Sequence, residues 1–240
     1  MSCTPATTIA VASHTFRVPA AAAAVGGRRH GTSAAQIKHN DRCCCCCCCW
    51  PTGGLLEGLR ALRVGGEITH VSLGMCCSQD GQDPPGGLTN LILRLICEAP
   101  AGTFDSAMLA YGWNLANQYA LPILLECQAR GIEVHPAGVF HFGGYGILFD
   151  PSKTDDTVLL EKHARWLELA TKHGFGLGAV AVGFASLPAV IGKVVLGMAS
   201  PEEVALNIDS IEEAAAIPSR LWHDARAAGL IDSAVPLPPL

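Results

Sequence analysis

The sequence has few charged residues and no excess of positive charge. Charged side chains make up 15% of the 240 residues, and the formal net charge is −5. A surface that binds nucleic acid needs clustered Lys and Arg, so this composition argues against a nucleic-acid partner. Half of the residues are hydrophobic, which is enough apolar material for a sizeable core.

The N-terminal part of the chain lacks acidic residues, since the first one is Asp41. Basic residues are scattered there among Ala, Ser and Thr: Arg17, Arg28, Arg29 and Lys38. This composition is typical of an organellar transit peptide, and the alternative is misframed sequence. Residues 1–49 are predicted to be a disordered leader because they lack apolar periodicity. The expected location is the cytoplasm, or a chloroplast or mitochondrion if the leader is a transit peptide.

Twelve cysteines are present, but they lack the spacing of a disulfide framework or a zinc site. Seven of them are consecutive, Cys43 to Cys49. Adjacent cysteines cannot all satisfy disulfide geometry, and zinc sites use separated ligand pairs. The other five show no pairing pattern and are typical of a reduced intracellular protein. A metal or redox role for the run is therefore the weakest functional hypothesis, and no metal ligand is predicted.

One stretch without charge reaches membrane-spanning length, from Gly174 to Gly192. Five glycines and Pro188 interrupt it. A buried helix of small residues over 177–187, followed by a turn and a strand that ends at Leu196, explains it better. No membrane span is predicted.

From Trp50 onward, helical and strand patterns alternate, which is typical of α/β proteins with parallel strands. The predicted strands are 68–73, 104–110, 132–140 and 193–196. The predicted helices are 55–63, 88–97, 119–129, a long one capped by Asp155 or Asp156 and ended by Gly174, 177–187, one after Ser200, and 219–228. Residues 50–240 are therefore predicted to form one α/β unit of four parallel strands flanked by helices.

The most informative stretch is 194–207, where a strand leads directly into a helix. Val194 to Leu196 is a short apolar run of the kind buried in a parallel sheet, and Gly197 ends it. Ser200 is predicted to be the N-cap of the helix, with Pro at the first helical position and Glu203 completing a capping box. The unpaired N–H groups of such a helix start form an anion site at the carboxyl end of a strand.

Several segments between Leu55 and Ile231 carry a family resemblance together: 55–62, 68–75, 104–110, 120–134, 138–140, 197–204 with Asn207, and 228–231. Their order and spacing resemble the C-terminal half of the aldo-keto reductase barrel, closest to the D-threo-aldose 1-dehydrogenase and L-galactose dehydrogenase branch. The resemblance implies a partial (β/α)8 barrel that contains strands five to eight. Such a half barrel leaves two open parallel edges, so self-association through these edges is expected.

The resemblance also implies a nicotinamide dinucleotide bound beyond the ends of the strands. Gly74 and Cys76 stand where relatives have Gly-Met-Asn, and a thiol does not replace both the donor and the acceptor of that Asn amide. Phe140 stands in the loop that covers the cofactor, with core packing as the alternative role. The cofactor is NAD or NADP.

Around the last strand, Gly197, Ala199 and Ser200 complete the predicted cofactor loop. Ala199 replaces an Arg that faces the adenosine 2′-phosphate in relatives, so the resemblance favours NAD over NADP. Glu203 and Asn207 stand where the family meets the adenine ribose and ring. The capping box gives Glu203 a complete structural role as well.

The family's catalytic Tyr, Lys, Asp and His belong to strands two to four and have no matching positions here. None of Tyr111, Tyr119 and Tyr145 has a Lys at a spacing that indicates an acid–base partner. No catalytic residue is therefore predicted. The implied function is an NAD(P)-dependent oxidoreductase of an aldose or a related carbonyl or hydroxyl compound, truncated and without its catalytic residues. The alternative is a non-catalytic remnant that binds a dinucleotide weakly or supports a partner.

Overall fold

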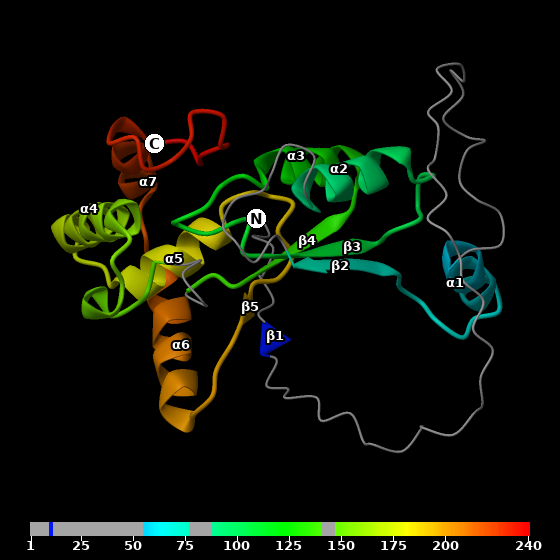
Figure 1. Cartoon of the computed structure of the whole chain (residues 1–240), viewed down its shortest axis with the longest axis horizontal. Helices are drawn as coiled ribbons and strands as arrows, with labels where there is room; N and C mark the ends of the chain where they lie inside the picture. Colours follow the sequence, from blue (N-terminus) through cyan, green and yellow to red (C-terminus); the bar gives the residue numbers. More distant parts are fainter. Residues whose placement is uncertain (1–9, 12–54, 77–87, 141–146) are drawn as a thin grey trace, which may run out of the picture.

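The computed structural model describes residues 10–11, 55–76, 88–140 and 147–240, and these ranges contain one parallel sheet with helices around it (Figure 1). The strands are β1 Ala10–Val11, β2 Ser72–Cys76, β3 Ser106–Ala110, β4 Glu133–Ala137 and β5 Val195–Leu196. The helices are α1 Leu55–Val64, α2 Leu88–Glu98, α3 Leu121–Arg130, α4 Thr157–His173, α5 Leu177–Ala185, α6 Pro201–Ala214 and α7 Ser219–Ala227, with a 3₁₀ turn at Pro151–Lys153. The α/β prediction is confirmed.

All strands run parallel in the order β1-β5-β4-β3-β2. Consecutive elements from β2 to β5 are neighbours in space, as expected for a barrel segment with helical crossovers. The four strands predicted from the sequence are β2 to β5. Ala10 and Val11 are the part of the leader that the structure describes, and they add a short edge strand beside Val195 and Leu196.

The first predicted strand, 68–73, starts too early, because β2 begins at Ser72. Ser72 pairs with Ser106, the first residue of β3. Just before that point, the N–H of Val71 donates to Asp105 Oδ2 over 2.7 Å, and the carbonyl of Val71 accepts from the backbone N–H of Asp105 over 2.9 Å. The Asp105 side chain thus takes the N–H of Val71 at the start of the ladder, and residues 68–71 lie outside β2.

Helix ends follow the local signals that the sequence contains. Asp156 caps α4, with its Oδ1 accepting from the N–H of Leu159 over 3.0 Å. Gly174 ends α4 with φ +77°, a left-handed conformation that glycine adopts without steric cost. None of the helices in the described ranges has both the length and the hydrophobicity of a membrane span. Within the charge-free stretch, α5 is a nine-residue buried helix.

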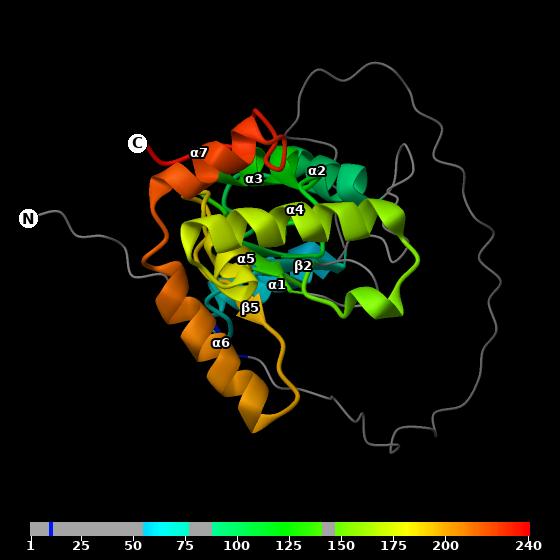
Figure 2. The same ribbon diagram turned by 90° about the vertical axis from the view of Figure 1, so that its left-hand side faces the viewer.

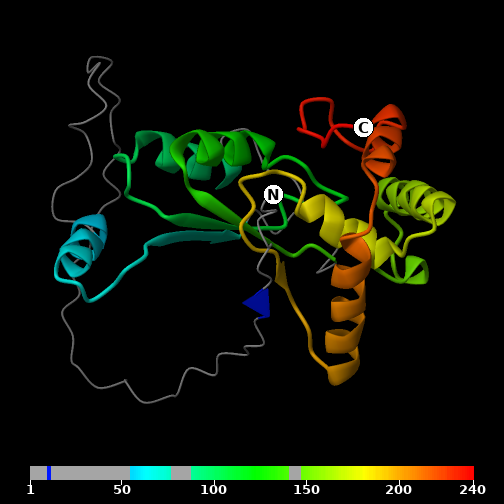
Figure 3. The same cartoon turned by 180° about the vertical axis from the view of Figure 1, so that it is seen from behind.

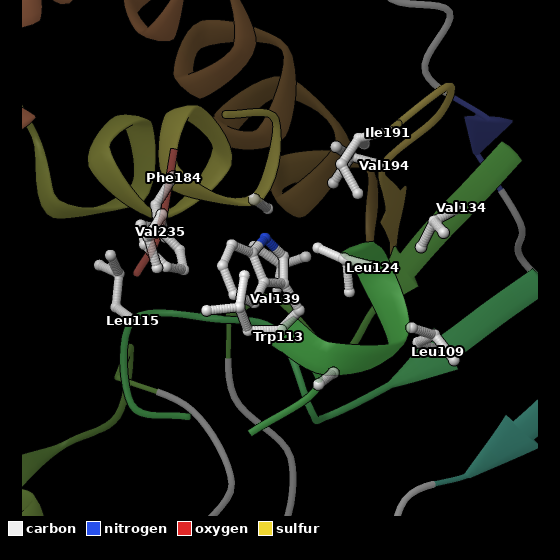
Figure 4. Close-up of a cluster of buried hydrophobic side chains, with 14 of the residues drawn as sticks. Leu109, Trp113, Leu115, Leu124, Val134, Val139, Phe184, Ile191, Val194 and Val235 are labelled. Atoms are coloured by element: carbon white, nitrogen blue, oxygen red, sulfur yellow. The ribbon is translucent and has the colours of Figure 1, made fainter. Parts of the chain in front are cut away.

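The core lies on one side of the sheet, where α2 and α3 pack (Figures 1 and 3). Ala107 and Leu109 of β3 and Val134 of β4 point to this side and are fully buried. Further along the sheet the core continues around Trp113, whose ring stacks on Phe184 at 4.9 Å between centroids (Figure 4). The indole of Trp166 meets the same phenyl ring edge-on.

The alternate strand residues face the other side, which is the interior face of a closed barrel. This face is polar and partly open to solvent. Ser106 Oγ donates to Ser72 Oγ over 3.0 Å, and His135 contacts Glu133 at 2.5 Å. Met108 between them is 39% exposed.

A buried asparagine fixes the ends of β3 and β4 to each other. The Nδ2 group of Asn114 donates to the carbonyl of Tyr111 (3.2 Å) and to the carbonyl of Gly138 (3.1 Å). Its Oδ1 accepts from the N–H groups of Ala116 and Asn117, each at 2.9 Å. Because a buried amide is costly unless it is hydrogen-bonded, these four bonds define one conformation of the loop.

These hydrogen bonds of Asn114, called the Asn114 clamp below, include one to a tyrosine in a rare backbone conformation. Tyr111 has φ +68°, the only positive φ of a non-glycine residue in the described ranges. Its ring lies against Gly138, which also has a positive φ (+67°), and a Cβ at that glycine would overlap the ring. The close approach of ring and backbone therefore requires glycine at position 138.

We expect the two cysteines of known environment to react very differently. Burial, reinforced by the nearby Glu126 carboxylate, raises the pKa of the Cys127 thiol to about 12, so that only about 10⁻⁴ of it is ionised at pH 8. Cys97 is exposed, and its pKa is raised by partial burial and by Glu126. Iodoacetamide at pH 8 should label Cys97 but not Cys127 in the native protein, and both in urea, as measured by peptide mass spectrometry. Equal native labelling would contradict the burial of Cys127.

Gly138→Ala should destabilise the protein more than Gly131→Ala, although both glycines have nearly the same positive φ. At Gly131 no atom lies within 4 Å of an added Cβ, so only the backbone cost of about 1 kcal/mol applies. At Gly138 the overlap with the Tyr111 ring adds an overpacking cost, for a total of about 3 kcal/mol. Urea denaturation measures both free energies of unfolding.

The added cost should disappear when the ring is removed. In the background of Tyr111→Gly, Gly138→Ala should cost about as much as Gly131→Ala does. An unchanged large cost in that background would show that the ring is not the obstacle.

Candidate functional site

The carboxyl ends of the parallel strands meet at one edge, where ligands bind in parallel α/β folds. The segments that continue from this edge are Cys76 at the end of β2, Tyr111 after β3, Gly138 to Phe140 after β4, and Gly197 after β5. The hydrogen bonds of the Asn114 side chain join the segment after β3 to the segment after β4. The edge is therefore a fixed surface between β3 and β4.

The start of α6 has the capping box that the sequence predicts. Ser200 Oγ accepts from the N–H of Glu203 over 3.2 Å. In return, Glu203 Oε2 accepts from the N–H of Ala199 over 2.5 Å. The carboxylate reaches one residue beyond the N-cap, so it holds the loop 197–200 as well as the helix.

Asn207 holds the same loop from the next turn of α6. Its side chain is 8% exposed, and its Nδ2 donates to the carbonyl of Gly197 over 3.3 Å. Gly197 itself is exposed, and no atom lies within 4 Å of a Cβ added there. Asn207 is thus positioned to fix the loop rather than to reach a ligand.

The anion site at the start of α6 is already engaged by the helix's own carboxylates. The N–H of Glu202 and the hydroxyl of Ser200 bond to the Glu202 carboxylate and hold its pKa below the usual value. Glu203 takes the N–H of Ala199. A phosphate at this place would therefore meet two negative charges, whereas a hydroxyl donor would meet two acceptors.

The predicted cofactor residues fall into separate groups. Gly74 and Cys76 lie on β2, and β3 and β4 separate that strand from β5, which leads to the loop 197–200. In Figures 1 and 2 the start of α6 stands at one extremity of the molecule, away from β2. Phe140 is half-buried and packs against the core, which agrees with its alternative role. Tyr145, one of the three tyrosines, lies outside the described residues.

A cavity that no sequence pattern indicates lies on the other side of the loop after β3. This cavity has a volume of about 450 Å³, and Tyr119 and Lys162 both line it. They are far apart in the sequence, Tyr119 in the loop after β3 and Lys162 on α4, and the fold brings them to one cavity. Among the described residues, no three His, Cys, Asp or Glu side chains are grouped as metal ligands would be.

Comparison with known proteins shows similarity at the level of the fold. No family model matches the sequence, and no curated protein matches it. The holo form of aldo-keto reductase AKR11C1 from Bacillus halodurans superimposes with a TM-score of 0.52 and 17% identity, over 75% of this chain and 56% of that chain. The apo form gives a TM-score of 0.51 and 17% identity, over 75% and 57%.

The chain thus spans a little over half the length of these structures. The order of β2 to β5 and the helices between them are what the two proteins share as a fold. The parallel sheet and its helices have the fold of part of an aldo-keto reductase barrel.

Proposed function

We propose that the chain is an aldo-keto-reductase-like, NAD(P)-dependent oxidoreductase, of the branch that oxidises aldoses or related hydroxyl and carbonyl compounds. The observation that carries the proposal is the fold: four consecutive parallel strands with aldo-keto reductase topology that end at one edge. Active sites of such barrels lie at the carboxyl ends of the strands. This chain supplies the half that follows the strands of the catalytic residues.

The residues at the start of α6 fit the ribose hydroxyls of a nicotinamide dinucleotide better than its phosphates. Exposed carboxylates at Glu202 and Glu203 are acceptors for ribose hydroxyls, and an acidic residue in this role is typical of NAD sites. The same charges repel a 2′-phosphate, and Ala199 offers no cation to offset them. The residues present therefore favour NAD over NADP and give weak binding overall.

The chemistry of the bound nicotinamide is to accept or donate a hydride. What this chain contributes is a loop held by Glu203 and Asn207, and the fixed edge formed by Tyr111, Asn114 and Gly138. Neither element provides a Tyr–Lys pair of the kind that moves the proton of the sugar hydroxyl. Oxidation therefore needs the part of the barrel that carries strands two to four.

The second candidate is a non-catalytic remnant that binds a dinucleotide weakly or supports a partner. The engagement of the α6 anion site by Glu202 and Glu203 favours it. Self-association through the free edge of the sheet, an aldose-like substrate, and a location in the cytoplasm or in an organelle remain parts of the proposal. Open parallel edges are the physical reason for the first of these.

We predict that the chain binds NAD at least as tightly as NADP. Ala199→Arg should shift the ratio of the two dissociation constants toward NADP by about ten-fold, because a guanidinium beside the 2′-phosphate adds a charge-assisted hydrogen bond. Isothermal titration calorimetry on the full chain measures both constants.

The matched control is Ala205→Arg, which adds the same charge at an exposed position further along α6. It should leave the ratio unchanged. A strong preference for NADP in the unaltered chain would show that the correspondence at Ala199 is wrong. Absence of binding to either dinucleotide would contradict the proposed function itself.

We also predict that the 240-residue chain alone does not oxidise aldoses at a useful rate. A positioned proton-transfer group contributes about 10²–10⁴-fold, and its absence is not offset by binding alone. The assay follows NADH absorbance with L-galactose, L-fucose and D-arabinose, for the chain and for a version completed with strands one to four. Turnover by the completed version alone supports the proposal, and inactivity of both supports the remnant. Robust turnover by the chain alone would contradict the prediction.

A further inference from the structure

The cavity beside Tyr119 and Lys162 contains none of the residues assigned to the dinucleotide. It lies between the loop after β3, α4 and the segment after α7. Behind it are four side chains of the core that are each less than a tenth exposed: Leu115, Trp166, Leu230 and Ile231. Its volume of about 450 Å³ is within the range of small-molecule sites.

Three elements form its walls, and side-chain hydrogen bonds join them. The Nε2 group of Gln118 donates to the carbonyl of Leu230 over 2.7 Å, and its Oε1 accepts from the N–H of Asp232 over 2.9 Å. The indole N–H of Trp166 donates to the carbonyl of Leu115 over 3.1 Å. The loop, α4 and the C-terminal segment are therefore held in one arrangement around the cavity.

Two cations stand one turn apart on the wall formed by α4. Lys162 Nζ donates to the carbonyl of Ala116 over 2.8 Å, and the guanidinium of Arg165 donates to the carbonyl of Ala228. An ammonium has three N–H donors and a guanidinium five, so both keep donors beyond these bonds. The one acid of the lining, Asp232, directs its Oδ1 to the N–H of Ala234 at 2.8 Å.

A neighbouring hollow of about 390 Å³ is lined by cations whose charge a carboxylate neutralises. It shares Arg165 and Leu230 with the cavity. There the carboxylate of Asp224 accepts from Arg220 (2.9 Å), from His173 (3.2 Å) and from Lys172 (3.3 Å). Partial burial opposes ionisation of Asp224, but these bonds outweigh it and lower the pKa. Lys172 and Arg220 of this hollow are already paired with Asp224. In the larger cavity Lys162 bonds to a backbone carbonyl, and Arg165 has only a long contact of 3.9 Å with the exposed Glu161 besides its carbonyl bond.

We propose that the larger cavity binds a small hydroxylated carboxylate, a molecule of the sugar-acid class. The carboxylate pairs with Lys162 and Arg165, which supply donors in a fixed frame. Its hydroxyls meet the polar groups of the lining, contributed by Asn117 and Asp232. The ring of Tyr119 offers an apolar surface to the carbon chain. This site is separate from the strand edge, so it does not depend on the dinucleotide proposal.

The test uses three probes that differ in one feature each. D-Gluconate has both the carboxylate and the hydroxyls, D-glucitol lacks the charge, and hexanoate lacks the hydroxyls. Each is titrated into the ¹⁵N-labelled full chain, and the indole N–H signal of Trp166, assigned with Trp166→Phe, is followed by NMR. Saturable binding of gluconate, at least about ten-fold tighter than that of either other probe, is expected.

Charge-removing variants locate the binding. Lys162→Gln and Arg165→Gln should each weaken gluconate binding about ten-fold, because each removes a charge-assisted hydrogen bond. The control is Arg94→Gln, which removes an equally charged side chain from an exposed pair with Glu98 on α2 and should have no effect. Arg165 is 42% exposed on its side chain, so its variant is expected to fold, and circular dichroism checks this.

Three results would overturn the proposal. One is the absence of saturable gluconate binding by the folded chain. Another is binding of glucitol or hexanoate as tightly as gluconate, which would show that the site does not recognise the carboxylate or the hydroxyls, respectively. The third is gluconate binding that both glutamine variants leave unchanged, which would place the ligand elsewhere.

Discussion

The candidate site depends on the four hydrogen bonds of one buried side chain. Asn114 joins the loop after β3 to the turn after β4, and it satisfies all of its amide groups in doing so. It helps to hold the positive φ of Tyr111, a conformation that is costly for a non-glycine residue, together with the bond from the N–H of Tyr111 to the carbonyl of Ala137. The clamp fixes both the strand edge on one side of the loop and, through the backbone of Ala116 and Asn117, the cavity on the other.

The two sides of that loop carry different chemistry. On the strand side, the ring of Tyr111 closes over Gly138 at the edge where barrels place their ligands. On the other side, the carbonyl of Ala116 receives Lys162, and Gln118 fixes the C-terminal segment. The loop after β3 therefore forms part of both surfaces, and its conformation is common to them.

Local signals made much of the secondary structure predictable. The caps at Asp156 and Ser200 and the stop at Gly174 depend on residues within one turn, so the sequence alone indicates them. The start of β2 was not predictable, because it is set by Asp105, whose carboxylate reaches Val71 from another segment. The bond from Asn114 to the carbonyl of Gly138 is long-range as well, and so is the approach of Tyr119 and Lys162 to one cavity. No periodicity or motif predicts such contacts, because the partners become neighbours only in the folded chain.

The edge strand β1 has a consequence for the order in which the protein forms. Ala10 and Val11 pair with Val195 and Leu196, so about three quarters of the chain lies between the partners. Closing so long a loop has a high entropic cost and gains only two residue pairs, whereas β2, β3 and β4 pair within short separations. During synthesis the N-terminal segment leaves the ribosome long before β5 exists. The β5 edge is thus the last part of the sheet to be covered. Until β1 pairs with it, this edge of a newly made chain is open to strands of other chains.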